Sequence, residues 1–320
     1  MEKFNIPVAL IFFNRPDCVK QVMEVICKVK PSKLFLISDA ARAEKENEEQ
    51  LVKASRDIVE SMIDWECEIV KNYASENMGC YDRIANGATW VFSQVKKCIF
   101  LEDDNVPSLS FFTYCEEMLN KYENNDKIYW VCGGNYLVDY KAKNNASYMF
   151  TRQMFPCGWA SWSDKWAKYD GFIKELNKNT FEEFISNYDN PKMRYYYRYI
   201  YEKIMFEIQE GKRLYTWDYQ WLFRVVMDQA YAIAPSKNLI RNIGVGPQAT
   251  HGSVKMTKRL KGLILLENKE LEFPLVHPDK IELDKNFENL IEERLGGVPQ
   301  FNYRLSRFKK ILSGRYYKWK

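Results

Sequence analysis

The chain has 320 residues, of which 46% are hydrophobic and 15% aromatic. This length is enough to bury a full core, and this composition excludes an intrinsically disordered protein. The 47 basic residues exceed the 43 acidic ones by four, which is too small an excess to indicate nucleic-acid binding.

No signal peptide or membrane-spanning segment is expected. The first apolar run stops at Asn14 and Arg15 without a small-residue cleavage site, and no apolar stretch approaches the ~20 residues that cross a bilayer. The 8 cysteines are scattered without a CxxC pair, and neither of the 2 histidines is near a cysteine, which argues against a zinc site. These features predict reduced thiols and a cytoplasmic protein.

The first hundred residues alternate between strand and helix patterns. Continuous apolar runs predict buried strands over residues 7–13, 34–37, 67–70 and 97–101. Between them, helices are expected from Pro16 onward, over 44–62 and over 81–95. This alternation predicts an α/β fold with a doubly wound sheet.

The second half is less regular. Strands are expected over 128–132 and 231–234, and aromatic-rich helices over 159–166, 181–188, 193–209 and 217–227. From residue 253 onward the chain is more charged, with an acidic amphipathic helix expected over 287–295.

Polar side chains follow three of the predicted strands. Asn14 and Arg15 follow the first strand, Asp39 follows the second, and the run 102–104 (Glu-Asp-Asp) follows the fourth. Doubly wound sheets bind ligands beyond the carboxyl ends of their strands. Three adjacent carboxylates repel one another, and a divalent cation offsets that repulsion while also taking oxygen ligands from a diphosphate. The alternative is a solvated acidic turn.

Several segments resemble one enzyme family. LEDDNVPSLSFFTYCEEML resembles the metal-binding strand end of GT-A nucleotide-sugar transferases, particularly N-acetylglucosaminyltransferase I and bacterial transferases built like it. Further segments resemble motifs of that family in the same order: FFNRPD, LISDAAR, NMGCYDRIANGATWVF, FPCGWASWSDKW, TWDYQW and NLIRNIGVGPQATHG. The resemblance covers about residues 5–252 and departs from the family at Ala40 and Ala41, which replace a Gly-Pro pair.

The resemblance implies a GT-A domain over 1–252, with a nucleotide-binding half (1–105) and an acceptor-binding half (106–252), and a C-terminal extension over 253–320. The implied activity is metal-dependent, inverting transfer of a sugar from a nucleoside-diphosphate donor, with a UDP-sugar expected. The implied acceptor is the hydroxyl of a saccharide or lipid-linked saccharide in bacterial surface polysaccharide synthesis. The expected cation is manganese, with magnesium as the alternative.

The resemblance also implies residues for the donor. Asp104 is expected to hold the metal. His251 is a candidate second metal ligand or hydrogen-bond donor to a phosphate. The remaining donor contacts would come from five strand-end residues and Arg83; the five are Asn14, Arg15, Asp39, Glu102 and Asp103. Surface salt bridges are the alternative role for the arginines.

Asp218, in TWDYQW, is the expected general base that takes the proton of the acceptor hydroxyl. A single base without a nucleophilic carboxylate implies inversion at the anomeric carbon. The alternative is a helix N-terminal acid favoured by the helix dipole. Gly158, Trp159 and Trp217 are expected near the sugar, although the helical spacing of Trp159, Trp162 and Trp166 also suits a core stripe.

The segment 301–320 carries seven basic and no acidic residues. Phe301, Leu305, Phe308 and Leu312 fall on one helical stripe, and Tyr and Trp stand near the end. This pattern is typical of an interfacial anchor on anionic lipid, so a peripheral position at the inner face of the cell membrane is expected. A helix docked on the domain is the alternative.

Two other functions compete with glycosyl transfer. A nucleotidyltransferase that makes nucleotide sugars would usually carry a glycine-rich phosphate loop after the first strand, where this chain has FNRPD. A catalytically silent nucleotide-sugar-binding protein is the other alternative.

Overall fold

The computed structural model describes residues 4–245, 262, 265–296, 300–314, 317 and 319. The strands are β1 (Val8–Phe12), β2 (Lys33–Ser38), β3 (Glu68–Tyr73), β4 (Lys97–Glu102), β5 (Asn105–Pro107), β6 (Ile128–Cys132), β7 (Tyr148–Thr151), β8 (Trp159–Trp162), β9 (Tyr231–Pro235) and β10 (Ile240–Asn242). The helices are α1 (Pro16–Val29), α2 (Glu48–Ser61), α3 (Cys80–Phe92), α4 (Leu109–Lys121), η1 (Lys143–Asn145), α5 (Ser163–Trp166), α6 (Lys178–Ser186), α7 (Pro191–Gln209), α8 (Asp218–Met227), α10 (Lys285–Gly296) and α11 (Gln300–Leu312).

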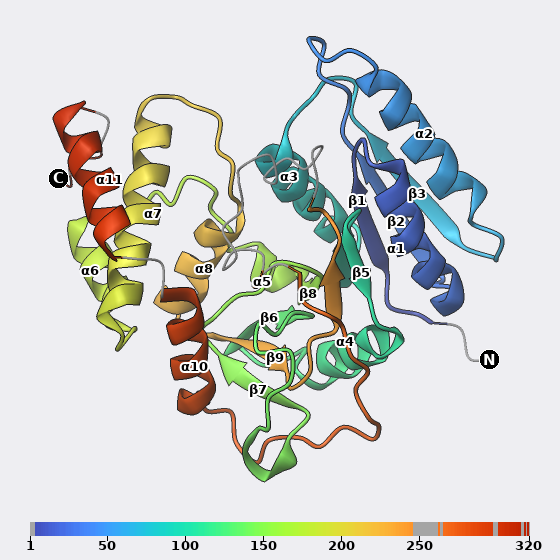
Figure 1. Cartoon of the computed structure of the whole chain (residues 1–320). Coiled ribbons are helices and arrows are strands. Elements are labelled where there is room, and N and C mark those ends of the chain that lie inside the picture. Colours follow the sequence, from blue (N-terminus) through green and yellow to red (C-terminus); the bar gives the residue numbers. More distant parts are fainter. Residues whose placement is uncertain are drawn as a thin grey trace.

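Eight strands form one mixed sheet in the order β3-β2-β1-β4-β8-β6-β9-β7. In Figure 1 the sheet extends from β3 at the right to β7 near the bottom. β1 is parallel to both β2 and β4, because α1, α2 and α3 return the chain to the same edge before each new strand. β8 is antiparallel to β4 and β6, and β7 is antiparallel to β9. The predicted fold class, a doubly wound mixed α/β sheet, is confirmed.

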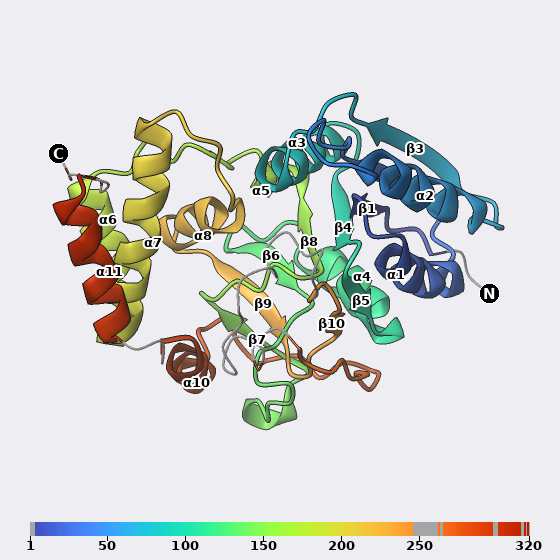
Figure 2. The ribbon, with the colours of Figure 1, turned by 45° about the horizontal axis from the view of Figure 1, so that its top comes forward.

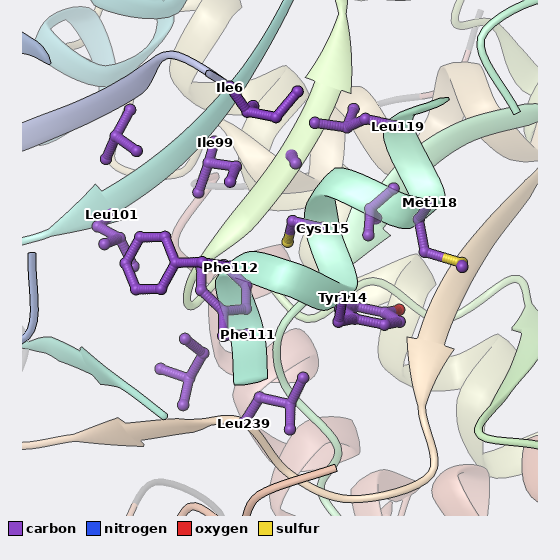
Figure 3. Close-up of a cluster of buried hydrophobic side chains, with 14 of the residues drawn as sticks. Ile6, Ile99, Leu101, Phe111, Phe112, Tyr114, Cys115, Met118, Leu119 and Leu239 are labelled. Atoms are coloured by element: carbon purple, nitrogen blue, oxygen red, sulfur yellow. The ribbon is translucent and has the colours of Figure 1, made fainter. Parts of the chain in front are cut away.

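Helices cover both faces of the sheet, which explains why its strands are apolar on both sides. On one face, α1 and α4 pack against Leu10 and Leu101 of the central strands. Figure 3 shows the α4 contribution, with Phe111, Phe112 and Cys115 in the same buried cluster as Ile99 and Leu101. On the opposite face, α3 and α8 pack against Phe100. The strands β1, β2 and β4 are therefore almost entirely buried, whereas β3 at the edge of the sheet is partly exposed.

A third apolar cluster joins α6, α7 and α8 beyond the sheet. Figures 1 and 2 both place α6, α7 and α11 at the end of the molecule opposite α1 and α2. α10 instead packs against one face of the sheet through Phe287 and Ile291, which are fully buried in the same hydrophobic cluster as Phe100. Part of the segment 253–320 therefore shares the hydrophobic core of the strands.

The helix predicted over 159–166 is wrong in its first half. Trp159–Trp162 form β8, which pairs with both β4 and β6, and α5 begins only at Ser163. Pairing with strands distant in the sequence outweighs the helical spacing of the tryptophans. The short strands β5, β7 and β10, of 3, 4 and 3 residues, were not expected from the sequence.

All 8 cysteines are free, as expected. Over the described part of the chain, no helix has the length and apolar character required to span a membrane.

Candidate functional site

The ends of β1 and β4 meet at one edge of the sheet because the two strands are parallel neighbours. There the backbone amide of Phe13 donates to Asp103 Oδ2 at 3.0 Å. Arg15 lies between two carboxylates, in an ion pair with Asp103 and with its Nη1 2.8 Å from Asp104 Oδ2. The structure therefore brings together three residues that the sequence placed at two strand ends.

The carboxylates at this edge are electrostatically crowded. Burial raises the pKa of Glu102 to about 8, and the charges of Asp104 and Asp103 add to the rise. Burial also raises the pKa of Asp103 to about 6, although Arg15 opposes the shift. Burial alone would lower the pKa of Arg15, but the two aspartates raise it overall. One guanidinium thus lies near three carboxyl groups, so a further positive charge at this edge would be stabilised.

The donor set fits a magnesium- or manganese-type cation that receives most of its ligands from a diphosphate. Such ions are usually bound by one or two protein carboxylates together with phosphate oxygens and water. Among the residues that the structure describes, no group of three or more His, Cys, Asp or Glu side chains is arranged to hold a metal ion. Asp104 and Glu102 are therefore candidate ligands that would need oxygens from a substrate to complete the shell.

The loop after β10 passes directly over Asp104. The amide of Ile243 donates to the Asp104 backbone oxygen at 2.9 Å. A Cβ added to Gly244 would lie 1.9 Å from Asp104 Oδ2, so only a glycine permits this approach. His251, the other candidate metal ligand, lies outside the described residues.

Asp39 ties the end of β2 to the start of α3. Its two carboxylate oxygens accept from the amides of Ala40, Met78 and Gly79 at 2.9, 2.9 and 2.8 Å, and from Asn77 Nδ2 at 3.2 Å. A carboxylate offers about four lone-pair sites, and the chain itself fills all of them here. In this structure the Asp39 side chain shapes the turn and leaves no oxygen free for a nucleotide.

Arg83 is also engaged by the chain. Its side chain is buried, and its Nη2 donates to Asn72 Oδ1 at 3.0 Å at the end of β3. Burial lowers the pKa of Arg83. The guanidinium therefore holds β3 rather than pointing into open solvent at the strand ends.

Glu48 is a buried residue of this region that the sequence did not single out. It accepts from Asn14 Nδ2 at 2.9 Å and from Arg42 Nε at 2.9 Å. Burial alone would raise the pKa of Glu48, but the hydrogen bonds from Arg42 and Asn14 lower it overall. Glu48 thus holds the side chain of Asn14, a predicted nucleotide contact. It was not predicted because it lies in an acidic stretch of the sequence where no local pattern distinguishes it from its neighbours.

Arg213 is a second residue that sequence reasoning missed. It lies in the connection between α7 and α8, and its Nη2 donates to the Asn77 backbone oxygen at 3.0 Å. Its guanidinium also covers Gly79, where an added Cβ would lie 2.5 Å from Cζ. The contact joins the loop that precedes Asp218 to the turn that Asp39 organises.

Asp218 is the first residue of α8 and belongs to the same polar region. Burial raises the pKa of Asp218 to about 6, while the backbone amides of Asp218 and Tyr219 oppose the rise. The charge of Asp218 also contributes to raising the pKa of Glu102, and to raising the pKa values of the Cys80 and Cys157 thiols, for which burial is the largest cause. Asp218 therefore lies within electrostatic range of the strand-end carboxylates. In the sequence, Asp104 and Asp218 are 114 residues apart.

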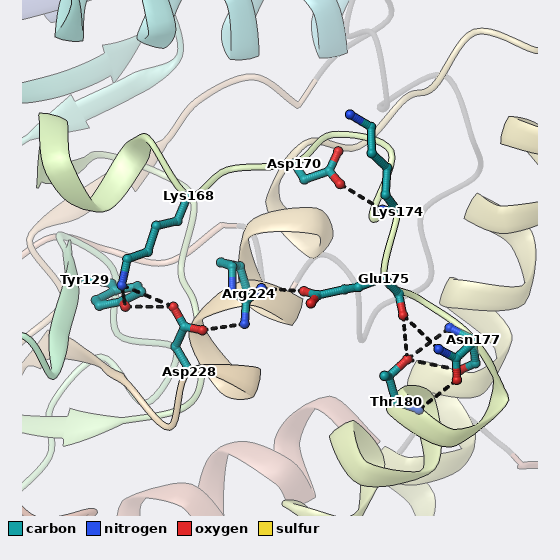
Figure 4. Close-up of polar contacts among 9 residues, drawn as sticks. All are labelled: Tyr129, Lys168, Asp170, Lys174, Glu175, Asn177, Thr180, Arg224 and Asp228. Atoms are coloured by element: carbon teal, nitrogen blue, oxygen red, sulfur yellow. Dashed lines mark hydrogen bonds and ion pairs between the residues drawn. The ribbon is translucent and has the colours of Figure 1, made fainter.

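The far end of α8 is anchored by a polar network, shown in Figure 4. Arg224 pairs with both Glu175 and Asp228. Tyr129 of β6 donates its hydroxyl to Asp228 Oδ2 at 2.7 Å. Because this network ties α8 to the sheet, the first residue of the helix is held in a defined position.

The indoles of Trp159 and Trp217 lie in the core. Trp159 is 1% exposed and stacks between Phe100 and Trp130, with ring centroids 4.1 and 4.3 Å away. The Trp217 ring is 5.3 Å from Trp159 and is also buried. Neither ring presents a face to a sugar in this structure, because Trp159 lies in the interior strand β8 and Trp217 packs beside it at the start of α8.

Gly158 allows the chain to turn into β8. Its φ is +63°, and an added Cβ would lie 2.4 Å from Ile240 Cδ1. Gly211 has nearly the same φ, +60°, with nothing within 4 Å. Both alanine variants meet left-handed backbone strain, but only Gly158→Ala also overpacks the interior. We expect Gly158→Ala to lower the unfolding free energy by about 1–3 kcal/mol more than Gly211→Ala, measured by urea denaturation. Equal losses of unfolding free energy in the two variants would show that the side chains around Ile240 rearrange to accommodate the added methyl group.

Neither a protein-family model nor a curated protein sequence matches the chain, so the resemblance to N-acetylglucosaminyltransferase I rests on the motifs alone. Similar solved structures include UDP-glucose pyrophosphorylase complexed with UDP-glucose, at 10% identity and TM-score 0.35, covering 74% of this chain and 92% of that one. Mannose-1-phosphate geranyltransferase from Thermus thermophilus is similar at 10% identity and TM-score 0.37, covering 73% and 74%. Mouse xyloside xylosyltransferase 1 is similar at 11% identity and TM-score 0.28, covering 41% and 53%. Similarities this distant leave the activity to be argued from the site.

Proposed function

We propose that the protein is an inverting, metal-dependent glycosyltransferase that moves a sugar from a nucleoside-diphosphate donor to an acceptor hydroxyl. The observation that carries the proposal is the placement of Asp218, a carboxylate with a pKa near 6, within electrostatic range of the acidic end of β4. In this proposal residues 1–105 bind the nucleotide and residues 106–252 bind the acceptor. A UDP-sugar is the first donor to test.

At the donor side, Asp104 and Glu102 would hold a manganese or magnesium ion against the diphosphate. The bound ion would supply electrostatic stabilisation for the charge that develops on the departing diphosphate. Arg15 keeps Asp103 and Asp104 oriented through its two ion pairs. Asn14 is held beside them by Glu48.

At the acceptor side, Asp218 acts as the general base. Its carboxylate takes the proton of the acceptor hydroxyl while the hydroxyl oxygen forms a bond to the anomeric carbon and the bond from that carbon to the diphosphate oxygen breaks. A pKa near 6 leaves Asp218 ionised at neutral pH yet basic enough to accept a proton. Because the proposal places Glu102 against the bound cation, its carboxylate would not be free to attack the anomeric carbon. A single displacement with inversion follows.

A nucleotidyltransferase is the competing enzyme class. Such an enzyme would need free donors after the first strand for a triphosphate. Here the segment between β1 and α1 is Phe13-Asn14-Arg15, without glycine, and the Arg15 side chain is occupied by Asp103 and Asp104. These features favour transfer of the sugar.

The products of turnover distinguish the functions. The protein is incubated with manganese, a panel of UDP-, GDP- and dTDP-sugars and a panel of saccharide acceptors. Release of nucleoside diphosphate together with an elongated saccharide supports the proposal. Release of pyrophosphate from a nucleoside triphosphate and a sugar 1-phosphate establishes the competing class. Saturable donor binding without either product indicates the silent binding protein.

A further inference from the structure

The two sides of α11 differ sharply in what they contact. Arg307 donates from Nε and Nη2 to the two carboxylate oxygens of Glu202 in α7, at 2.8 and 2.9 Å. Trp319, which follows the helix, stacks on Phe181 of α6 at 4.6 Å and donates from Nε1 to Glu202 at 3.3 Å. Glu202 is buried, so this is a firm attachment of the helix to α6 and α7.

The side of α11 that faces away from α7 carries an apolar stripe. Leu305, Phe308 and Leu312 are 41%, 57% and 72% exposed, and their spacing of three and four residues places them on one face. Figures 1 and 2 both show α11 at the outer edge of the molecule beside α7. This apolar stripe is therefore presented to the surroundings.

Positive charge flanks the apolar stripe. Lys309 is exposed between Phe308 and Leu312. Arg304 follows on the other side, next to Leu305, and its guanidinium lies 6.0 Å from the ring centroid of Tyr195 in α7. No acidic residue occurs in the whole segment 301–320, which has seven basic residues. An apolar face bordered by Lys and Arg matches the boundary between the acyl chains and the headgroups of an anionic lipid layer.

We propose that Leu305, Phe308 and Leu312 of α11 insert into the surface of an anionic membrane while Lys309 contacts its phosphates. The residues that hold the helix on the protein are different ones. Arg307 and Trp319, which the sequence pattern assigned to the membrane anchor, instead bind Glu202 and Phe181. In this proposal α11 contacts the membrane with one face while its other face stays attached to α7, so the helix does not act as a flexible linker.

The full-length protein is sedimented with vesicles of phosphatidylcholine alone and with vesicles that contain about 30% phosphatidylglycerol, without any substrate. We expect binding only to the anionic vesicles. Phe308→Ser/Leu312→Ser removes two inserted side chains, so the partition coefficient should fall by about 10-fold or more. Phe172→Ser is the matched control, because Phe172 is also 57% exposed but lies outside α11. It should bind as the unmodified protein does.

The charge contribution is tested separately. Lys309→Gln should weaken binding to the anionic vesicles by about 5-fold, since a Lys near such a surface contributes roughly 1 kcal/mol. Lys20→Gln, at an exposed position of α1, should have no effect. Thermal unfolding of each variant checks that the fold is kept.

Three results would overturn the proposal. The first is sedimentation that is unchanged in Phe308→Ser/Leu312→Ser. The second is the absence of any binding by the unmodified protein. The third is a dimer of the unmodified protein that the double substitution disperses, which would show that a second copy of the chain covers the stripe. None of these measurements involves turnover, so they are independent of the proposed activity.

Discussion

Asp218→Asn is expected to lower kcat by about 10²- to 10⁴-fold, the usual contribution of a positioned general base. The amide keeps the size of the side chain but accepts no proton, so the KM for the donor should change little. In the unmodified enzyme, kcat should rise with pH through about 6, as Asp218 loses its proton. The variant should lose this dependence. Initial rates between about pH 5 and pH 8 measure both effects.

Asp228→Asn is the matched control, because Asp228 follows the opposite end of the same helix. It should reduce stability by breaking contacts with Arg224 and Tyr129, but it should keep kcat within a few-fold. If Asp218→Asn turned over the donor as fast as Asp228→Asn does, Asp218 would not be the base.

The two variants should also differ in stability. Burial raises the pKa of Asp218 from the ordinary 3.8 to about 6, so the unfolded chain releases this proton more readily than the folded one. The unfolding free energy therefore falls as pH rises from about 4 through 6. The neutral amide escapes this loss, and Asp218→Asn should be about 1–2 kcal/mol more stable at pH 8. Such a gain together with lost activity is expected of a functional residue, not of a structural one.

Asp104→Asn is expected to lower kcat/KM by about 10³-fold, because a direct ligand of a catalytic ion supports several kcal/mol of charge stabilisation. The remaining activity should no longer respond to manganese concentration. Asp64→Asn is the control, since the Asp64 side chain is 76% exposed and its ion pair with Lys30 is long, at 3.9 Å. Manganese-dependent rates measured on both variants separate loss of the site from loss of surface charge. A normal manganese response in Asp104→Asn would remove this residue from the site.

The strand-end cluster could be predicted from the sequence because it depends on few assumptions. Buried apolar runs identified β1 and β4, and parallel neighbours bring their carboxyl ends to one edge. The contacts between Arg15, Asp103 and Asp104 follow from that arrangement. The pKa of Asp218 could not be foreseen, because it depends on how much chain surrounds the carboxylate.

Other features depend on pairings between distant segments. The spacing of Trp159 and Trp162 suits a helix face, but it says nothing of β4 and β6, which enclose this segment as β8. Asp39 looked available at a strand end, yet the amides of Met78 and Gly79 arrive from the next crossover and fill its oxygens. Glu48 is buried where Asn14, which follows β1, and Arg42, which precedes α2, both contact it. Local patterns carry no information on such contacts.

The central claim, that a divalent cation at the acidic end of β4 holds the diphosphate of the donor, is tested most directly by calorimetric titration. UDP, GDP and dTDP are titrated into the protein with manganese and, separately, with excess chelator. We predict that at least one nucleotide binds with manganese, and that its affinity falls by about 100-fold or more with chelator and in Asp104→Asn. Binding of the same nucleotide with equal affinity in all three conditions would contradict the claim.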